Sequence, residues 1–195
     1  MDMPFDALGE VSDDALLILF AGGDADAARV LTQRLTPVVY GHALRLLGGD
    51  RAEAEDVAQE AMLRLWRIAP EWRQGEARVT TWLYRVVANL CMDRQRKARA
   101  VALDDVAEPP DEAPGALSGI EDRQRVAALH AALAALPDRQ RQAVVLRHIE
   151  GLGNPEIAGI MDISTEAVES LTARGKRALS AALAGRRAEL GFGDD

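Results

Sequence analysis

The chain has 195 residues, of which 48% are apolar, 28% are charged and only 4% are aromatic; this length suffices for one or two small domains. A single cysteine, Cys91, excludes an intramolecular disulfide framework and a metal site built from several cysteines. The net charge of −8, taken as an average, argues against a nucleic-acid partner.

The negative charge is concentrated in two segments. Residues 1–28 contain seven acidic side chains and no basic ones, and residues 100–122 contain the same numbers. These segments carry −14 against a total of −8, so the rest of the chain carries +6. The sequence therefore predicts mildly basic folded parts with an acidic N-terminal tail and an acidic linker. Both anionic segments would compete with DNA for the basic faces, so we expect weak DNA binding by the free protein.

Neither a targeting segment nor a membrane segment is visible. The N-terminus lacks the basic and apolar regions of a signal peptide. No run of about 18 consecutive apolar residues occurs. We expect a cytoplasmic protein without membrane insertion, in keeping with the lone cysteine.

Every element expected in the first half of the chain is a helix, because alanine and leucine dominate and the apolar spacing is helical. A short helix follows Ser12. A second spans residues 24–47, where Pro37 favours a kink. A third opens at Asp50, which forms a capping-box-like pair with Glu53.

The third helix has one apolar arc and one polar arc, and we expect the apolar arc to face the core. Leu63 lies in the middle of the polar arc. It is either an isolated exposed leucine or an anchor for a partner, and the pattern leaves both interpretations open. The apolar arc consists of Ala54, Val57, Ala58, Ala61, Met62, Leu65 and Ile68.

The fourth helix, about residues 80–96, carries an exposed polar stripe and a cationic end. Arginine and asparagine on such a stripe can reach phosphates and base edges. The cationic end fits the helix dipole equally well, so the pattern alone does not decide. The stripe consists of Thr81, Arg85, Asn89, Met92 and Arg96.

Four aromatic side chains lie within 19 residues, at the end of the third helix and the start of the fourth. Trp66 is interpreted as a core residue. Trp72, Trp82 and Tyr84 flank the polar loop 73–80, and they either pack in the core or stack on unpaired bases.

Residues 101–119 (VALDDVAEPPDEAPGALSG) are rich in Pro, Asp, Glu and Gly and lack a usable apolar face. They predict a flexible acidic linker. The expected fold class is all-α, with two small helical domains joined by this linker. The expected boundaries are 1–99 for the first domain, 100–120 for the linker and 121–195 for the second domain.

The second domain shows the pattern of a helix-turn-helix. We expect helices at about 121–136, 138–150, 154–161 and 165–184, with Asp162 in the tight turn. Two short helices across such a turn place the second one in the major groove of DNA. A plain helical hairpin is the alternative on spacing alone.

Both halves of the chain carry short motifs. The first half has the run 50–66 (DRAEAEDVAQEAMLRLW), then Thr81-Trp82-Leu83 and Asn89-x3-Asp93-x2-Arg96-Lys97. The second half has Leu136-Pro137, Glu156-Ile157-Ala158 and Val168-x-Ser170. The first set resembles the second conserved region of the extracytoplasmic-function (ECF) sigma factors, and the second set resembles their fourth region. Together these motifs span nearly the whole chain in the right order.

The resemblance implies a dissociable subunit of bacterial RNA polymerase that recognises promoters, responds to stress and is controlled by an anti-sigma factor. It implies no catalytic residue, no metal and no cofactor. Binding to the polymerase core maps onto Asp56, Gln59, Glu60, Leu63 and Arg64. Recognition of the −10 element maps onto Arg78, Val79, Thr80, Thr81, Arg85, Asn89, Asp93 and Arg96. Recognition of the −35 element maps onto Ser164, Thr165, Glu166, Glu169, Ser170, Arg174 and Arg177.

Four positions depart from the family pattern. Val79 stands where many members have a phenylalanine in the melting loop, so base stacking there is lost. Asp162 replaces a frequent glycine, and aspartate tolerates the left-handed conformation. Glu169 and Leu171 stand where basic residues are frequent, so the −35 preference of relatives does not transfer.

Two further questions stay open at this stage. The linker acids either imitate nascent RNA in the polymerase, as the resemblance suggests, or merely solvate a spacer. The alternatives to a sigma factor are a two-domain transcriptional regulator and a helical adaptor. An enzyme is disfavoured because no nucleophile–base pair or phosphate loop is visible. Cys91, His42, His130 and His148 are interpreted as structural residues rather than as a metal-sensing site.

Overall fold

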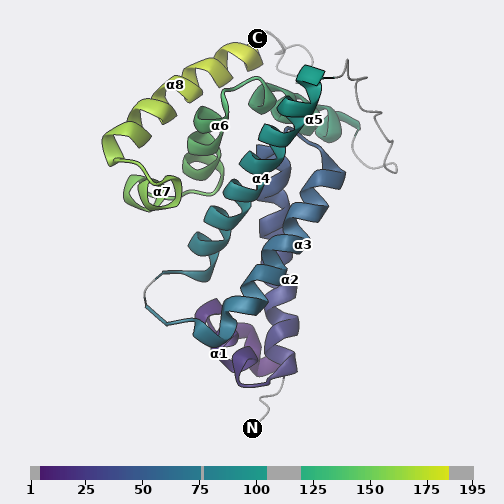
Figure 1. The fold of residues 1–195 in the computed structure, drawn as a ribbon, viewed down its shortest axis with the longest axis vertical. Coiled ribbons are helices and arrows are strands. Elements are labelled where there is room, and N and C mark those ends of the chain that lie inside the picture. Colours follow the sequence, from purple (N-terminus) through teal and green to yellow (C-terminus); the bar gives the residue numbers. More distant parts are fainter. Residues whose placement is uncertain (1–4, 76, 105–119, 185–195) are drawn as a thin grey trace.

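A computed structural model describes residues 5–75, 77–104 and 120–184 (Figure 1). All regular elements in these ranges are helices. The first domain contains η1 (Phe5–Glu10), α1 (Asp13–Ala21), α2 (Ala25–Leu46), α3 (Arg51–Ile68), η2 (Ala69–Glu71) and α4 (Val79–Asp104). The second contains α5 (Ile120–Ala134), α6 (Asp138–Val144), η3 (Val145–Ile149), α7 (Asn154–Met161) and α8 (Thr165–Ala184). The all-α prediction is confirmed for the described residues.

Capping side chains fix the start of several helices. The Asp24 carboxylate accepts from the backbone N–H groups of Asp26 and Ala27 at 2.9 and 3.0 Å. Asp50 accepts from Glu53 N at 3.1 Å, and the Ser164 hydroxyl accepts from Ala167 N at 3.2 Å. These polar groups satisfy helix N–H groups that have no partner within the helix. The predicted starts of α2, α3 and α8 are therefore confirmed.

The fourth helix is longer than predicted. It begins at Val79 and continues to Asp104, past the expected end near Arg96 and into the segment expected as linker. Alanine and arginine are strong helix formers, and residues 97–104 contain no glycine or proline to end the helix. The rest of the expected linker, residues 105–119, lies outside the described residues.

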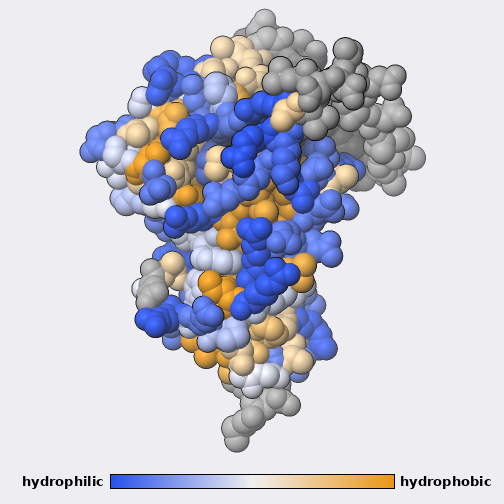
Figure 2. All heavy atoms as spheres, in the orientation of Figure 1, coloured by the Kyte–Doolittle hydropathy of each residue, from blue (hydrophilic) through white to orange (hydrophobic). Residues whose placement is uncertain are grey.

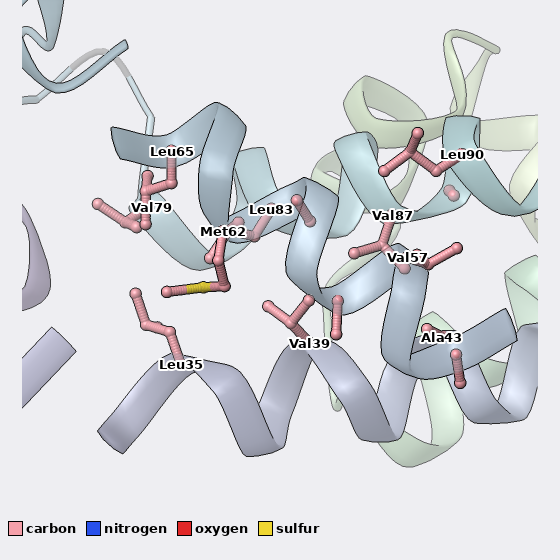
Figure 3. Packing of buried hydrophobic residues seen from close by; sticks show 14 of the residues in the cluster. Leu35, Val39, Ala43, Val57, Met62, Leu65, Val79, Leu83, Val87 and Leu90 are labelled. Carbon is pink, nitrogen blue, oxygen red and sulfur yellow. The ribbon is translucent and has the colours of Figure 1, made fainter. Parts of the chain in front are cut away.

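The core of the first domain lies between α2, α3 and α4 (Figure 3). Figure 3 shows Leu35 and Val39 of α2 facing Met62 of α3, with Val79 of α4 beside Leu65. The predicted apolar arc of α3 is buried except for Ile68, which is half-buried. Because three helices share this core, the outer faces of α3 and α4 are rigidly placed relative to each other.

The acidic N-terminal segment is helical from Phe5, earlier than the first helix expected after Ser12, and several of its carboxylates make contacts within the first domain. Asp13 pairs with Arg34 at 3.2 Å, and Asp14 accepts from the Trp72 indole N–H at 3.0 Å. Asp24 caps α2. These three carboxylates are therefore engaged in contacts that stabilise the first domain.

The two domains pack against each other. Leu133, Leu136, Val144 and Val145 of the second domain belong to the same buried cluster as the core of the first. Figure 1 shows α4 running between the α2–α3 pair and helices α6, α7 and α8, with α8 on the outer side and α5 near the upper end of α4. The turn before α8 has Asp162 at φ +53°, which confirms the left-handed turn expected there.

Candidate functional site

A groove of about 520 Å³ lies on the outer face of α2 and α3. Leu63, with 42% of its surface exposed, lines it together with Met62 and Trp66. Thr36 and Tyr40 of α2 line the opposite side. Leu63 is therefore part of a concave apolar surface, which favours the interpretation as an anchor. The sequence did not predict that α2 contributes to this surface, because the periodicity of one helix does not show which helix packs beside it.

Of the polar residues expected to bind the polymerase, only Gln59 lines this groove, whereas Asp56 lies toward α4, 3.7 Å from Arg94. Asp56, Gln59 and Arg64 are exposed. Glu60 pairs with Arg64 at 2.9 Å, and this hydrogen bond holds the pKa of the Glu60 carboxyl below its ordinary value. The arrangement is an apolar groove bordered by charges of both signs, which is the usual anatomy of a protein–protein interface.

The predicted stripe on α4 is exposed to solvent along its length. Arg85, Asn89 and Arg96 are exposed, and Thr81 is half-buried. Asp93 pairs with Arg96 at 2.9 Å. Arg78 is exposed just before the helix and Thr80 is half-buried in its first turn. Figure 2 shows hydrophilic residues gathered over the upper part of this face, where α4, α6 and α8 lie.

Val79 is a correction to the predicted DNA-binding residues. Its side chain is only 1% exposed and packs in the core beside Leu65 (Figure 3). It therefore cannot contact DNA in this arrangement. Its role is to pin the first turn of α4 to the core.

The aromatic side chains around the loop are largely committed to packing. Trp72 and Trp82 meet edge to face, with ring centroids 6.3 Å apart, and both are half-buried. Tyr84 is 7% exposed and lies under the second domain. Of the three candidates for base stacking, Tyr84 is thus covered as long as the domains stay packed.

The helix-turn-helix presents the first turns of α8 to solvent. Glu166, Glu169, Ser170, Arg174 and Arg177 are exposed, Thr165 is half-buried, and Ser164 caps the helix. The Asn154 amide of α7 donates to Glu169 at 3.3 Å. The backbone N–H of Glu166 and the Ser164 hydroxyl lower the pKa of the Glu166 carboxyl, as expected for an acid at a helix start. Buried Val168 and Gly175 hold the opposite side of α8 on the domain.

Two further kinds of site are absent from the described residues. No three His, Cys, Asp or Glu side chains gather there in a way that could hold a metal ion. None of the described helices is long and apolar enough to cross a membrane.

Comparisons with known proteins cover both domains. Residues 31–101 match the sigma-70 region 2 family and residues 127–179 match the sigma-70 region 4 family. The RNA polymerase sigma-H factor of Pseudomonas aeruginosa is 31% identical over 187 residues, covering 90% of this chain and 96% of that protein. The ECF RNA polymerase sigma factor SigM of Mycobacterium tuberculosis is 33% identical, covering 88% and 84%.

The chain belongs to the ECF sigma factors of the sigma-70 family. Among solved structures, CnrH in complex with the cytosolic domain of CnrY is similar to it, with a TM-score of 0.65 and 25% identity. That alignment covers 89% of this sigma factor and 97% of CnrH. RpoE of Bartonella quintana, in complex with the anti-sigma factor NepR, shares the fold with a TM-score of 0.66. This sigma factor is a transcription initiation factor and not an enzyme.

The contact between the two domains of this sigma factor was not predicted. Glu150, at the end of η3, accepts from His42 Nδ1 at 3.1 Å and from Arg45 at 3.0 Å on α2. Its other oxygen accepts from the Tyr84 hydroxyl of α4 at 3.0 Å. One signal was present in the sequence: an acidic residue at a helix C-terminus opposes the dipole, so it needs cationic or donor partners elsewhere.

Proposed function

We propose that this sigma factor binds the polymerase core through the α2–α3 groove and recognises promoters through α4 and α8. The observation that carries the proposal is that three separate exposed surfaces are present, two on the first domain and one on the second. They are an apolar groove with Leu63, a stripe with Arg85 and Asn89, and a helix-turn-helix with exposed N-terminal residues on α8. Each has the chemistry that its partner requires.

The work at the promoter is binding rather than bond making. Opening the −10 element costs a few kcal/mol per unstacked base, and contacts to the extruded base offset this cost. Val79 is buried, so the exposed Arg85, Asn89 and Arg96 of α4 are the candidates for contacts to base edges. On α8, Arg174 and Arg177 supply phosphate contacts, and Glu169 can accept from a cytosine amino group.

Control of this sigma factor is proposed to rest on a protein partner. CnrH is bound by the cytosolic domain of CnrY, and RpoE is bound by NepR. By analogy, this chain is expected to bind an anti-sigma factor that covers its polymerase-binding or DNA-binding surfaces, in the cytoplasm and in response to stress. The linker acids are proposed either to occupy the path of nascent RNA or to act as a solvated spacer.

In-vitro transcription with purified polymerase core on a genomic promoter pool tests the proposed function. Start sites read by sequencing are expected to appear only when the sigma factor is added. The double substitution Arg85→Ala and Asn89→Ala should abolish them, whereas Arg139→Ala, an exposed arginine on α6, should not. Unchanged start sites with and without the protein would exclude a sigma factor that directs initiation and favour the regulator or adaptor alternative.

A further inference from the structure

Glu150 stands at the centre of a buried polar contact between the two domains. Only 9% of its side chain is exposed, and the ring of His42 beneath it is fully buried. Three donors from the first domain surround it, two on α2 and one on α4. Burying a carboxylate costs free energy unless hydrogen-bond donors satisfy it. Because these donors come from the other domain, Glu150 is satisfied only when the two domains pack in this arrangement.

The local backbone turns Glu150 toward the first domain. The chain leaves α6 through the π turn of η3, in which Glu150 N donates to Val145 O at 3.0 Å. Gly151 follows with φ +74°, and Leu152 N donates to Leu146 O at 3.0 Å. This end structure places an acid where the helix dipole disfavours it. The donors that compensate it all belong to the other domain.

Further contacts extend the surface around Glu150. The buried Arg141 of α6 donates to the carbonyl of Leu46, the last residue of α2, at 2.6 Å. The close approach at Gly48 requires a glycine, because a Cβ atom there would lie 2.9 Å from the Ala134 Cβ. Arg99 of α4 also pairs with Asp138 of α6. The contact thus combines apolar packing, buried hydrogen bonds and close backbone approach.

This packed arrangement is incompatible with reading both promoter elements. Tyr84 of α4 and Val168 of α8 lie in one small apolar cluster. The −10 and −35 elements are about 25 base pairs apart, or about 85 Å at 3.4 Å per base pair. The whole of α4, with 26 residues, is only about 39 Å long. Two reading helices that share one cluster cannot span that distance.

Because both elements can be read only when the domains separate, we propose that the contact of Glu150 with His42, Arg45 and Tyr84 is what holds the free sigma factor closed. The inference rests on the proposed roles of α4 and α8. It makes Glu150 a positioning residue that controls access to the DNA-reading surfaces, and it explains why an acid lies at this helix end.

The first experiment measures the distance between the domains in the full-length free protein. Spin labels are placed at Ala52→Cys on α3 and Ser180→Cys on α8, both exposed positions. Cys91 does not interfere, because burial raises the pKa of its thiol to about 12 and the side chain is covered. The labelled protein with Glu150 intact should give one narrow distribution of distances between the two labels. Glu150→Ala should give a broad distribution at longer distances, and the exposed Glu71→Ala should not.

The outcome of this experiment is decisive when helicity is measured alongside it. A broad distribution in the protein with Glu150 intact would overturn the proposal, as would an unchanged narrow one in a folded Glu150→Ala protein. If Glu150→Ala lowers helicity, the second experiment is used instead, because the second experiment keeps Glu150 and its partners intact.

The second experiment locks the domains together. Arg99→Cys on α4 and Asp138→Cys on α6 replace two side chains that meet across the contact, so a short reducible bismaleimide can bridge the two thiols. The protein is cross-linked, freed of excess reagent and only then mixed with polymerase core. The cross-linked form should lose promoter-specific transcripts by about tenfold or more, with recovery on reduction. Each single cysteine variant serves as the control and should be insensitive to the cross-linker.

The controls distinguish a failure of the proposed function from a failure of the closed form. If the reduced protein and the wild type give no promoter-specific transcripts, the proposed function fails. If both give transcripts and the verified cross-linked form gives them equally well, the proposed function stands and the closed form is overturned.

Discussion

Leu63 offers a direct test of the groove at the scale of one residue. Replacing it with alanine removes the apolar side chain that borders the groove but leaves the charged residues around it intact. Truncating a central apolar anchor typically costs 2 kcal/mol or more, so affinity for the polymerase core should fall by about thirtyfold. Stability should change little, because Leu63 is 42% exposed. Fluorescence anisotropy with labelled protein and core polymerase measures the affinity.

Ile18 provides the matched control for this prediction. It is also 42% exposed but lies on α1, and it does not line the groove. Ile18→Ala should leave the affinity for the polymerase unchanged. Equal effects of the two substitutions would mean that the groove is not the binding surface.

Single residues also show where prediction from sequence stops. The apolar arc of α3 was predictable because its periodicity is local. The partners of Glu150 and Arg141 were not, since His42 is 108 residues from Glu150 and Leu46 is 95 residues from Arg141. Val79 was assigned to DNA by its place in a family motif, whereas its apolar side chain is in the core. The apolar character of Val79 alone would have predicted a core position.

At the scale of the element, Gly175 determines how closely α8 packs on α6. A Cβ atom there would lie 2.6 Å from Val144 Cγ2 and 3.1 Å from Gln140 O. In an open helix, Gly→Ala stabilises by about 0.5–1 kcal/mol. Here the steric conflict should dominate, so Gly175→Ala is expected to destabilise the protein by about 1–3 kcal/mol. Urea unfolding followed by circular dichroism measures the change.

Gly159 of α7 is the matched control, because the same Gly→Ala substitution there causes no steric conflict. It is exposed, and a Cβ atom there would meet nothing within 4 Å. Gly159→Ala should therefore stabilise the protein slightly. A stabilising Gly175→Ala would show that α6 and α8 are less tightly packed than described.

The boundaries of elements were predictable where a local signal exists. Asp24, Asp50 and Ser164 are capping residues, and helices begin directly after each. The end of α4 lacked such a signal, since no glycine or proline follows until Pro109. A composition argument for the linker therefore placed its start too early. The π turn of η3 has no sequence signature, and it was not expected.

At the scale of the whole molecule, weak binding of DNA by the free protein now has a different basis. Asp13, Asp14 and Asp24, three of the seven acids of the first 28 residues that were expected to compete with DNA, make contacts that stabilise the fold. The packing of the two domains supplies a second reason, because it keeps α4 and α8 too close for both promoter elements. The linker acids remain candidates for competition, outside the described residues.

The groups around the Glu150 contact share one response to acid. Burial, only partly offset by Glu150, lowers the pKa of His42 below its ordinary value. Burial disfavours the ionised Glu150, but the hydrogen bonds from His42 and Tyr84, together with Arg45, bring its pKa below the ordinary value. Burial and nearby arginine charges also lower the pKa of His130. Each group is thus less protonated in the closed form than in the open one.

Acid is therefore predicted to open the molecule. Below about pH 6.5 the open form binds a proton at His42 that the closed form excludes, so the closed form loses stability as pH falls toward the lowered pKa. Glu150 acts in the same direction, because its contribution is present above its ordinary pKa and is lost as pH falls through the lowered one. The distance between labels at positions 52 and 180 should broaden between pH 7.5 and about 5.5 while helicity stays constant. His42→Gln, which cannot titrate, should weaken this response, and a pH-independent distance would show that the contact does not depend on these protonation states.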